Sequence, residues 1–347
     1  MSHLLDKYSY LKFMDHIEIE KLKNTVLKMM RDKKGILAAD ESNGTCNSRF
    51  KALGIPETEE ERRRWREILI SAPEMENYVN GVILYDETIR QSDSDGKKFT
   101  DVLKEKNVLV GIKVDEGLQE FIDHSGETLT HGLNGLPARM QEYKSLGATF
   151  AKWRAAYAIT ERTPTDDAIR ENSEILARYA VTCQEHDIVP MVEPEVLLDG
   201  SHDIQKAKDA TTKVLKGLFE ALEKHHVDLE GLILKTSMVL SGSKAENRAD
   251  AKAVAEATVE VLKECVPENV GGVVFLSGGQ TPDEATANLN EISKHEPLPW
   301  PLAFSFSRAI QNEALATWAG KPANVDLARE AYIARLKSNS MADQGLL

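Results

Sequence analysis

The sequence contains few cysteines and no long apolar run. Three cysteines (Cys46, Cys183 and Cys265) are scattered among 347 residues, so they indicate neither a disulfide framework nor a zinc site. No run of about 18 apolar residues predicts a membrane-spanning helix, and the start of the chain is too charged for a signal peptide. These absences predict a cytoplasmic protein.

Positive charge is also in short supply. The formal net charge is -13 at pH 7, which argues against a general affinity for nucleic acid or anionic membrane. Any phosphate that the protein binds must therefore be held by a local cluster of basic groups. With 41% hydrophobic residues, the chain is long enough for one large α/β barrel or for two ordinary domains.

Short, β-branched apolar segments alternate with longer amphipathic segments along almost the whole chain. The helical segments carry start signals such as Thr165-Asp166-Asp167 and Thr281-Pro282-Asp283-Glu284, and no Pro/Gly/Ser-rich linker divides them. This pattern predicts one α/β domain over residues 1–347, a (β/α)8 TIM barrel with extra helices within 1–34 and 309–347. A doubly wound sheet is the alternative. The predicted strands cover residues 36–40, 81–86, 108–115, 149–154, 188–195, 231–239, 271–279 and 302–308.

Charged residues are concentrated at the carboxyl ends of these predicted strands. Several occur as i, i+2 pairs, which project from the same face of a strand. Charges inside a barrel are costly unless they are paired or functional, and active sites of this fold lie at that end. A ring of structural salt bridges is the alternative, but three converging lysines favour a functional site. The residues are Asp40, Asp86, Lys113, Asp115, Lys152, Arg154, Glu193, Glu195, Lys235 and Arg308.

Lys235 lies near the end of an otherwise apolar segment, GLILKTSMV. A lysine is a nucleophile only when neutral, and burial and nearby positive charge, here from Lys113 and Lys152, both favour the neutral form. This pattern predicts a Schiff-base lysine; the alternative is a lysine that extends to solvent at the barrel rim. Glu193 and Glu195 place two carboxylates on one face, where they can transfer protons.

A pair of glutamates can also bind a metal ion. A catalytic metal site in such a barrel would need histidines at strand ends, whereas the nine histidines fall in helices, loops and termini. We therefore predict that the protein uses no metal and no other cofactor.

Two loops have the features of phosphate-binding sites. Ser277-Gly278-Gly279 leads into the helix that begins after Thr281, so its backbone can approach an anion at a helix N-terminus. Arg308 ends the neighbouring predicted strand, where barrels commonly hold phosphate. The second loop, residues 40–45 with Arg49, offers hydroxyl groups and a cation; an ordinary Asn-Gly turn is the alternative there.

Six motifs resemble those of class I fructose-bisphosphate aldolases, and the similarity runs in the same order from about residue 8 to about residue 345. They are GILAADES (35–42), GIKVD (111–115), AKWR (151–154), VEPE (192–195), the Lys235 segment and FLSGGQ (275–280). The resemblance implies metal-free, reversible cleavage of fructose 1,6-bisphosphate to dihydroxyacetone phosphate and glyceraldehyde 3-phosphate, in glycolysis and gluconeogenesis. It also implies a homotetramer.

The resemblance further implies roles for individual residues. Lys235 attacks C2, Glu193 is the general acid and base, Asp40 and Lys152 assist at the carbon–carbon bond, and Glu195 orients the two lysines. The C1 phosphate is held by Ser277, Gly278 and Arg308, with Ser307 beside them. The C6 phosphate is held by Ser42, Thr45, Lys113 and Arg49, and Arg154 supports that side.

Three departures from the family pattern stand out. Ser307 replaces a glycine of many relatives, and Thr45 replaces a serine. No tyrosine follows Tyr332, whereas animal members use a C-terminal tyrosine to help protonate the enamine, so we expect slow enamine protonation. Members of the family also dock on cytoskeletal proteins, which makes a binding scaffold the alternative function. A scaffold without catalysis would be expected to lose Lys235, Glu193 or Asp40, and all three are present.

Overall fold

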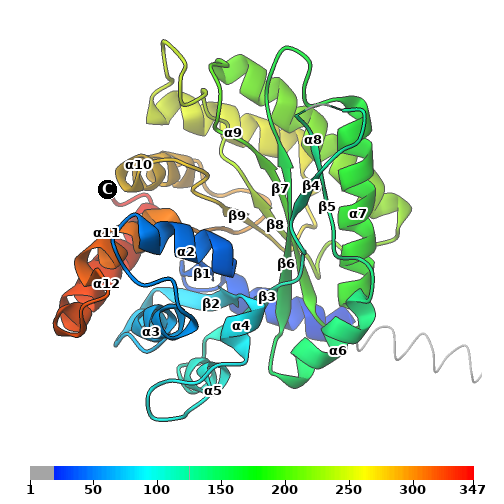
Figure 1. The fold of residues 1–347 in the computed structure, drawn as a ribbon. Helices are drawn as coiled ribbons and strands as arrows, with labels where there is room; N and C mark the ends of the chain where they lie inside the picture. The colour runs from blue at the N-terminus through cyan, green and yellow to red at the C-terminus, as the bar shows by residue number, and fades with distance from the viewer. Residues whose placement is uncertain (1–18, 125) are drawn as a thin grey trace, which may run out of the picture.

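Eight parallel strands form a nearly closed barrel surrounded by helices in the computed structural model, which describes residues 19–124 and 126–347 (Figure 1). The hydrogen-bonded order is β1-β2-β3-β6-β7-β8-β9-β10. The amide of Ala38 donates to the carbonyl of Phe306 at 3.1 Å and joins the first strand to the segment after the last. The predicted (β/α)8 barrel is confirmed, and the doubly wound alternative is wrong. The strands are β1 (Gly35–Ala39), β2 (Val79–Leu84), β3 (Leu109–Lys113), β6 (Phe150–Tyr157), β7 (Val189–Val196), β8 (Ile233–Thr236), β9 (Gly272–Phe275) and β10 (Leu302–Phe304).

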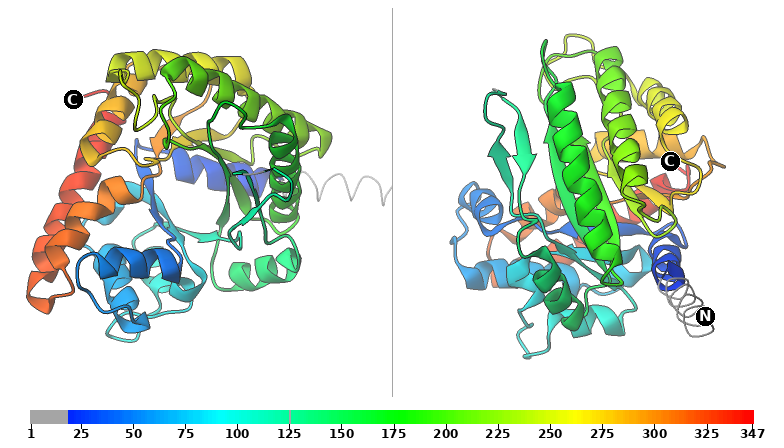
Figure 2. Two further views of the ribbon diagram at one scale, coloured as in Figure 1. Left: turned by 45° about the horizontal axis from the view of Figure 1, so that its top comes forward. Right: turned by 90° about the vertical axis from the view of Figure 1, so that its right-hand side faces the viewer.

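The helices lie outside the barrel, and a short hairpin of β4 (Leu118–Glu120) and β5 (Thr128–Thr130) stands beside α7 (Figure 2). The predicted start signals are confirmed, because Thr165 caps α7 and Thr281 forms a capping box with Glu284. None of the described helices is long and apolar enough to cross a membrane. The labelled helices are α2 (Asn43–Lys51), α3 (Glu59–Ile70), α4 (Asp86–Ile89), α5 (Phe99–Glu105), α6 (Leu136–Ser145), α7 (Asp166–Gln184), α8 (Ile204–Lys224), α9 (Ala251–Cys265), α10 (Pro282–Ser293), α11 (Arg308–Trp318) and α12 (Val325–Ala342).

The interior of the barrel is apolar at its amino end. Side chains from alternate strand positions, including Ile36, Phe150 and Ile233, form one buried cluster. A helix over residues 19–30 covers this end, and four of its side chains join the cluster: Leu22, Val26, Met29 and Met30. Residues 1–18 of the predicted N-terminal helical segment lie outside the described part of the chain. Gly111 is required here, because a Cβ atom at this position would lie 2.2 Å from the Phe150 ring.

The charged residues continue the same inward positions toward the carboxyl end. Asp40 follows Ala38, Lys152 follows Phe150, Glu193 follows Met191 and Lys235 follows Ile233, each two residues further along. The intervening residues, such as Ala39, Ala151 and Leu234, belong to the larger cluster between barrel and helices. The strand alternation therefore directs these charges into the barrel mouth.

Some strands end earlier than the sequence predicted. Strand β9 ends at Phe275 and β10 at Phe304, so the Ser277 loop follows its strand and Arg308 is the first residue of α11. Asp86 begins α4 rather than ending β2, and its carboxylate contacts Tyr143 at 2.9 Å and Arg90 at 2.8 Å. Asp86 therefore does not join the charged group in the mouth.

Candidate active site

Four buried charged side chains form a continuous chain across the barrel mouth. Lys152 Nζ lies 2.6 Å from Asp40 Oδ2 and 3.0 Å from Glu193 Oε2. Lys235 Nζ lies 3.0 Å from the other Glu193 oxygen, Oε1. Each residue is at most 8% exposed. Cations and anions alternate and their charges cancel, which is the arrangement in which buried charges are tolerated.

The charges set the protonation states of this chain. Burial alone would raise the pKa of Asp40, but the ammonium groups of Lys152 and Lys235 lower it to about 2. Burial also opposes ionisation of Glu193, yet the same two lysines hold its pKa below the ordinary value. Burial would lower the pKa of Lys152, but Asp40 and Glu193 raise it above the ordinary value. At neutral pH, Asp40 and Glu193 are therefore carboxylates and Lys152 is an ammonium.

Lys235 is enclosed rather than extended to the rim, since it is only 3% exposed. Its ion-pair partner is the Glu193 carboxylate, which Lys152 also contacts. The ammonium of Lys113, which the sequence argument placed near Lys235 as a source of positive charge, is held by Asp115, with the carbonyl and Oδ1 oxygens each at 2.7 Å. Lys235 thus has a proton acceptor within hydrogen-bonding distance.

Glu195 lies one inward position beyond Glu193 and is paired with Arg154. Within the described chain, its carboxylate makes no ion pair with Lys235 or Lys152. A Cβ atom added at Gly278 would lie 3.5 Å from Glu195 Oε1. Glu195 therefore lies beside the loop after β9.

The loop after β9 has a backbone that suits anion binding. Gly278 and Gly279 have φ values of 42° and 88°, which favour glycine. A Cβ atom at Gly278 would also lie 2.6 Å from Leu276. Arg308, the first residue of α11, is exposed. In the described part of the chain its guanidinium makes no ion pair or side-chain hydrogen bond. This cation remains available for a ligand.

The loop after β1 presents hydroxyl groups at the N-terminus of α2. Ser42 caps this helix, accepting from the Thr45 amide at 3.3 Å, and the two hydroxyl oxygens lie 3.1 Å apart. No acidic residue occupies the first turn of α2. The Arg49 guanidinium already has three protein partners: Glu41, Gln311 at 3.1 Å and Asn312 at 3.2 Å.

No role was predicted for Glu41 or Arg66 from the sequence. The Glu41 side chain is only 8% exposed and lies between two guanidinium groups, with Arg66 Nη1 at 2.9 Å and Arg49 on the other oxygen. It also accepts a hydrogen bond from the Ser307 hydroxyl at 2.9 Å. Arg66 belongs to a run of arginines on α3 (Arg62 to Arg64 and Arg66), and no local pattern distinguishes it from its half-buried neighbours.

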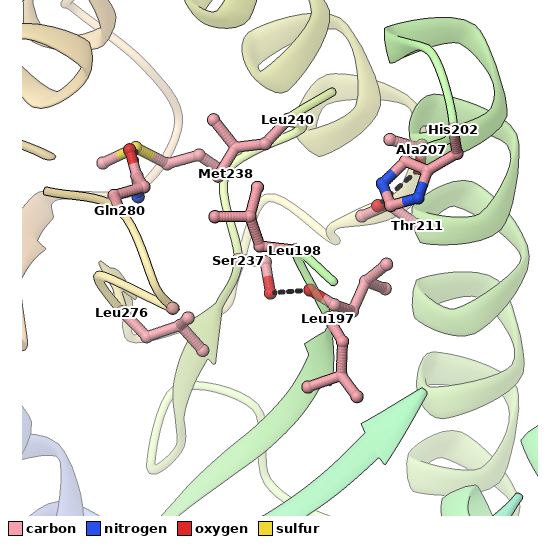
Figure 3. A pocket seen from close by; sticks show the side chains of 12 residues that line it. Leu197, Leu198, His202, Ala207, Thr211, Ser237, Met238, Leu240, Leu276 and Gln280 are labelled. Atoms are coloured by element: carbon pink, nitrogen blue, oxygen red, sulfur yellow. Dashed lines mark hydrogen bonds between the residues drawn. The ribbon is translucent and has the colours of Figure 1, made fainter. Parts of the chain in front are cut away.

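A small cavity lies behind the Ser277 loop, lined by residues that follow β7, β8 and β9 (Figure 3). Its volume is about 10 Å³, which is room for one water molecule and too little for a sugar phosphate. Ser237 donates to the Val196 carbonyl at its floor, at 2.9 Å. None of the four charged residues of the mouth lines this cavity. It is therefore a feature of loop packing and not the substrate site.

No group of three or more His, Cys, Asp and Glu side chains among residues 19–124 and 126–347 is arranged to hold a metal ion. Cys46, Cys183 and Cys265 are buried free thiols. Tyr332, the last tyrosine, is buried within α12.

Comparison with known proteins gives consistent matches along the chain. The family model for fructose-bisphosphate aldolase class-I matches residues 21–347. A probable fructose-bisphosphate aldolase class 1 of Xanthomonas axonopodis is 48% identical over 95% of this chain and 99% of its own length. The cytosolic fructose-bisphosphate aldolase 4 of Arabidopsis thaliana is 49% identical over 90% of this chain and 80% of its own.

A solved structure has a closely similar fold. It contains fructose-bisphosphate aldolase from Plasmodium falciparum in complex with TRAP and a small-molecule inhibitor. The match has a TM-score of 0.93 and 42% sequence identity, and it covers 94% of this chain and 95% of that one.

Proposed function

The chain belongs to the class I fructose-bisphosphate aldolase family, and on that premise we propose that Lys235 is the residue that forms the Schiff base. The enzyme is a carbon–carbon lyase of glycolysis that cleaves fructose 1,6-bisphosphate. The observation that carries the assignment is the position of Glu193, whose two carboxylate oxygens lie 3.0 Å from Lys235 and 3.0 Å from Lys152. One group is thus able to take a proton from the nucleophile and to pass it on.

Imine formation begins with transfer of a proton from the Lys235 ammonium to Glu193. The free amine adds to the C2 carbonyl carbon of the open-chain sugar, and its remaining protons allow a neutral carbinolamine to form. Glu193 then protonates the C2 hydroxyl, which leaves as water, and the C2–N bond becomes a protonated imine. Glu193 serves as base and as acid in turn.

Carbon–carbon cleavage uses the imine as an electron sink. Glu193 removes the C4 hydroxyl proton, the C3–C4 bond breaks, and its electron pair forms the enamine while glyceraldehyde 3-phosphate leaves. The Lys152 ammonium, held between Asp40 and Glu193, stabilises the negative charge that develops on the C4 oxygen. Protonation of C3 and hydrolysis of the imine then release dihydroxyacetone phosphate and restore Lys235. Glu195 acts at the rim, through Arg154 and the loop after β9.

We assign the C1 phosphate to Ser277, Gly278 and Arg308, with Ser307 beside them. The support is the left-handed backbone at Gly278 and the exposed guanidinium at the start of α11. We assign the C6 phosphate to the N-terminus of α2, where Ser42 and Thr45 present hydroxyl groups. The cations on that side are Arg49, Lys113 and Arg154. Each already holds a carboxylate of the protein, so a phosphate must share their donors.

We further propose that residues 1–347 act as one catalytic domain in a cytoplasmic homotetramer that binds neither nucleic acid nor membrane. The continuous family match over residues 21–347, the cytosolic relative and the net charge of -13 support these statements. Sedimentation of the purified protein distinguishes one, two and four copies of the chain.

Borohydride trapping tests the assignment of the nucleophile. Dihydroxyacetone phosphate and borohydride should add one sugar phosphate to each parent chain, as measured by intact mass. Lys235→Met should abolish the adduct, and Lys113→Met should retain it, because Lys113 lies on the C6-phosphate side. An adduct of undiminished yield on the Lys235→Met variant would contradict the proposal.

A further inference from the structure

The barrel is closed by a seam between β1 and β10. These strands are the two ends of the hydrogen-bonded strand order. Within the described chain, the backbone link across the seam is the bond from Ala38 N–H to the Phe306 carbonyl at 3.1 Å. The Gln311 side chain adds a bond to the Ala38 carbonyl at 2.7 Å. Side-chain hydrogen bonds therefore help to join the strands at this seam, whereas backbone hydrogen bonds join the other neighbouring strands of the barrel.

At the carboxyl end of this seam, Glu41 is the centre of a buried polar network. Arg66 from α3 and Arg49 from α2 bind its two oxygens, and the Ser307 hydroxyl donates to it from the other side of the seam. Burial alone would raise the pKa of Glu41, but the two guanidinium groups hold it below its usual range. The carboxylate is therefore ionised and can hold all three donors at once.

The two residues of this contact each precede one of the assigned phosphate sites. Glu41 is followed by Ser42, the N-cap of α2, and Ser307 is followed by Arg308. Ser307 occupies the N-cap position of α11 but makes no side-chain cap hydrogen bond. Its hydroxyl donates to Glu41 rather than to its own helix.

We propose that Glu41 and Ser307 form a bridge across the seam that fixes the distance between the C1-phosphate and C6-phosphate sites. Both are then positioning residues that act through Arg308 and the N-terminus of α2, and Ser307 is not a direct phosphate ligand. This inference rests on the proposed function. A bisphosphate must contact both sites at once, so its binding depends on their separation, whereas a monophosphate depends on one site alone.

The test compares fructose 1,6-bisphosphate with fructose 1-phosphate in variants of Ser307. Ser307→Ala removes the hydroxyl, and Ser307→Thr keeps it. We expect Ser307→Ala to raise KM for the bisphosphate about tenfold, the loss expected for one hydrogen bond to a charged group. KM for the monophosphate should change less than about twofold, and Ser307→Thr should restore most of the difference. Ser340→Ala, which removes a buried hydroxyl bonded to the Lys33 carbonyl, is the matched control and should change neither value.

Two results would overturn the bridge. One is an equal rise of KM for both substrates in Ser307→Ala, which would make Ser307 a ligand of the phosphate they share. The other is no change for either substrate with thermal stability lowered, which would make the contact purely structural. The same samples are trapped with dihydroxyacetone phosphate and borohydride. If the parent chain forms no adduct at Lys235, the proposed function fails; an adduct in all variants with unchanged KM ratios overturns the bridge alone.

Discussion

Asp40 and Asp343 are both buried aspartates, yet their surroundings give them opposite charge states. Asp40 lies in the barrel mouth 2.6 Å from the Lys152 ammonium, and its pKa is lowered to about 2. Asp343, which follows α12, is fully buried, and neither carboxylate oxygen has a hydrogen-bond partner among the described residues. Burial raises the pKa of Asp343 to about 7, an effect that Lys33 opposes and Glu296 reinforces.

The comparison shows that the partner, more than burial, determines whether a carboxyl group is charged. Lys33 is the cation near Asp343, but Glu296 binds it with both oxygens at 2.5 Å. In the mouth, by contrast, the ammonium groups of two lysines alternate with two carboxylates, and each carboxylate contacts at least one ammonium group. The first arrangement leaves a group whose ionisation opposes folding, and the second provides ionised groups for proton transfer.

Lys152→Met would remove the ion-pair partner of Asp40 and leave this carboxyl group buried without a partner among the described residues, as Asp343 is. Two buried carboxyl groups would then lack their shared cation, so we expect stability at pH 7 to fall by about 3–5 kcal/mol. Activity should fall by roughly 10³-fold, since the charge near the C4 oxygen is lost. The pKa of Asp40 or Glu193 would rise in the folded state, so part of the stability should return as the pH is lowered toward 5.

Urea unfolding and steady-state kinetics measure both effects for Lys152→Met. Lys106→Met is the matched control, because it breaks a partly exposed ion pair with Glu76 at 2.8 Å and should cost about 1 kcal/mol or less. Equal losses of stability in the two variants would show that the ion pairs of the mouth contribute no more to the free energy of unfolding than a partly exposed ion pair does.

Asp343→Asn tests whether ionisation of the buried Asp343 carboxyl group destabilises the fold. The folded pKa of Asp343, about 7, lies above its value of about 3.9 in an unfolded chain. The contribution of Asp343 to stability is therefore fully present below pH 4 and is lost as the pH rises through 7. The variant removes this loss, so it should be more stable than the parent at pH 8 by on the order of 4 kcal/mol and similar to it near pH 4.

Thermal unfolding between pH 4 and pH 8 measures the effect of Asp343→Asn. Asp326→Asn is the control, because Asp326 lies in α12, the helix that precedes Asp343, with a side chain 90% exposed, and it should leave the pH dependence unchanged. Parallel curves for the parent and Asp343→Asn would contradict the account.

Arg308→Ala tests a charged group that has no ion-pair partner among residues 19–124 and 126–347. Because the guanidinium is exposed at the start of α11, its removal should leave the melting temperature unchanged. The loss of a charge-assisted contact to phosphate should weaken binding by about 1.5–3 kcal/mol, measured as the Kd of dihydroxyacetone phosphate. Arg170→Ala, at an exposed position on α7, is the control. Binding by Arg308→Ala that equals parental binding would show that the assignment is wrong.

The smallest effect is expected from removal of divalent metal. The carboxylates of Asp40 and Glu193 are already bound by ammonium groups, and we expect EDTA to change turnover by less than about twofold. A large loss that zinc restores would assign the carboxylates of the mouth to a metal.

The fold could be predicted from the sequence because two periodicities coincide. Alternation along the strands distinguishes inward from outward residues, and the capped starts at Thr165 and Thr281 separate strands from helices. Strand ends were less predictable, since Asp86 and Arg308 begin helices where apolar patterning alone continues the strand. Hydrogen bonding to the neighbouring strand decides where a strand ends, and a single sequence does not contain that information.

The inward charges of the mouth could also be predicted, because i, i+2 spacing fixes their face. Their pairing could not. Charge patterns alone suggested that Lys113 and Lys152 would supply positive charge near Lys235. In the structure Lys113 is paired with Asp115, Lys152 is paired with Asp40 and Glu193, and Glu193 lies against Lys235. Arg66 reaches Glu41 from a helix 25 residues away in sequence, a contact that depends on the packing of α3 against the barrel.

Peptide mapping of the borohydride-trapped parent enzyme tests most directly whether Lys235 is the nucleophile. After reaction with fructose 1,6-bisphosphate or dihydroxyacetone phosphate, the protein is digested and the modified peptide is sequenced by mass spectrometry. We expect a single adduct on Lys235, whose ammonium lies 3.0 Å from Glu193 Oε1. An adduct on Lys152 or Lys113 would contradict it.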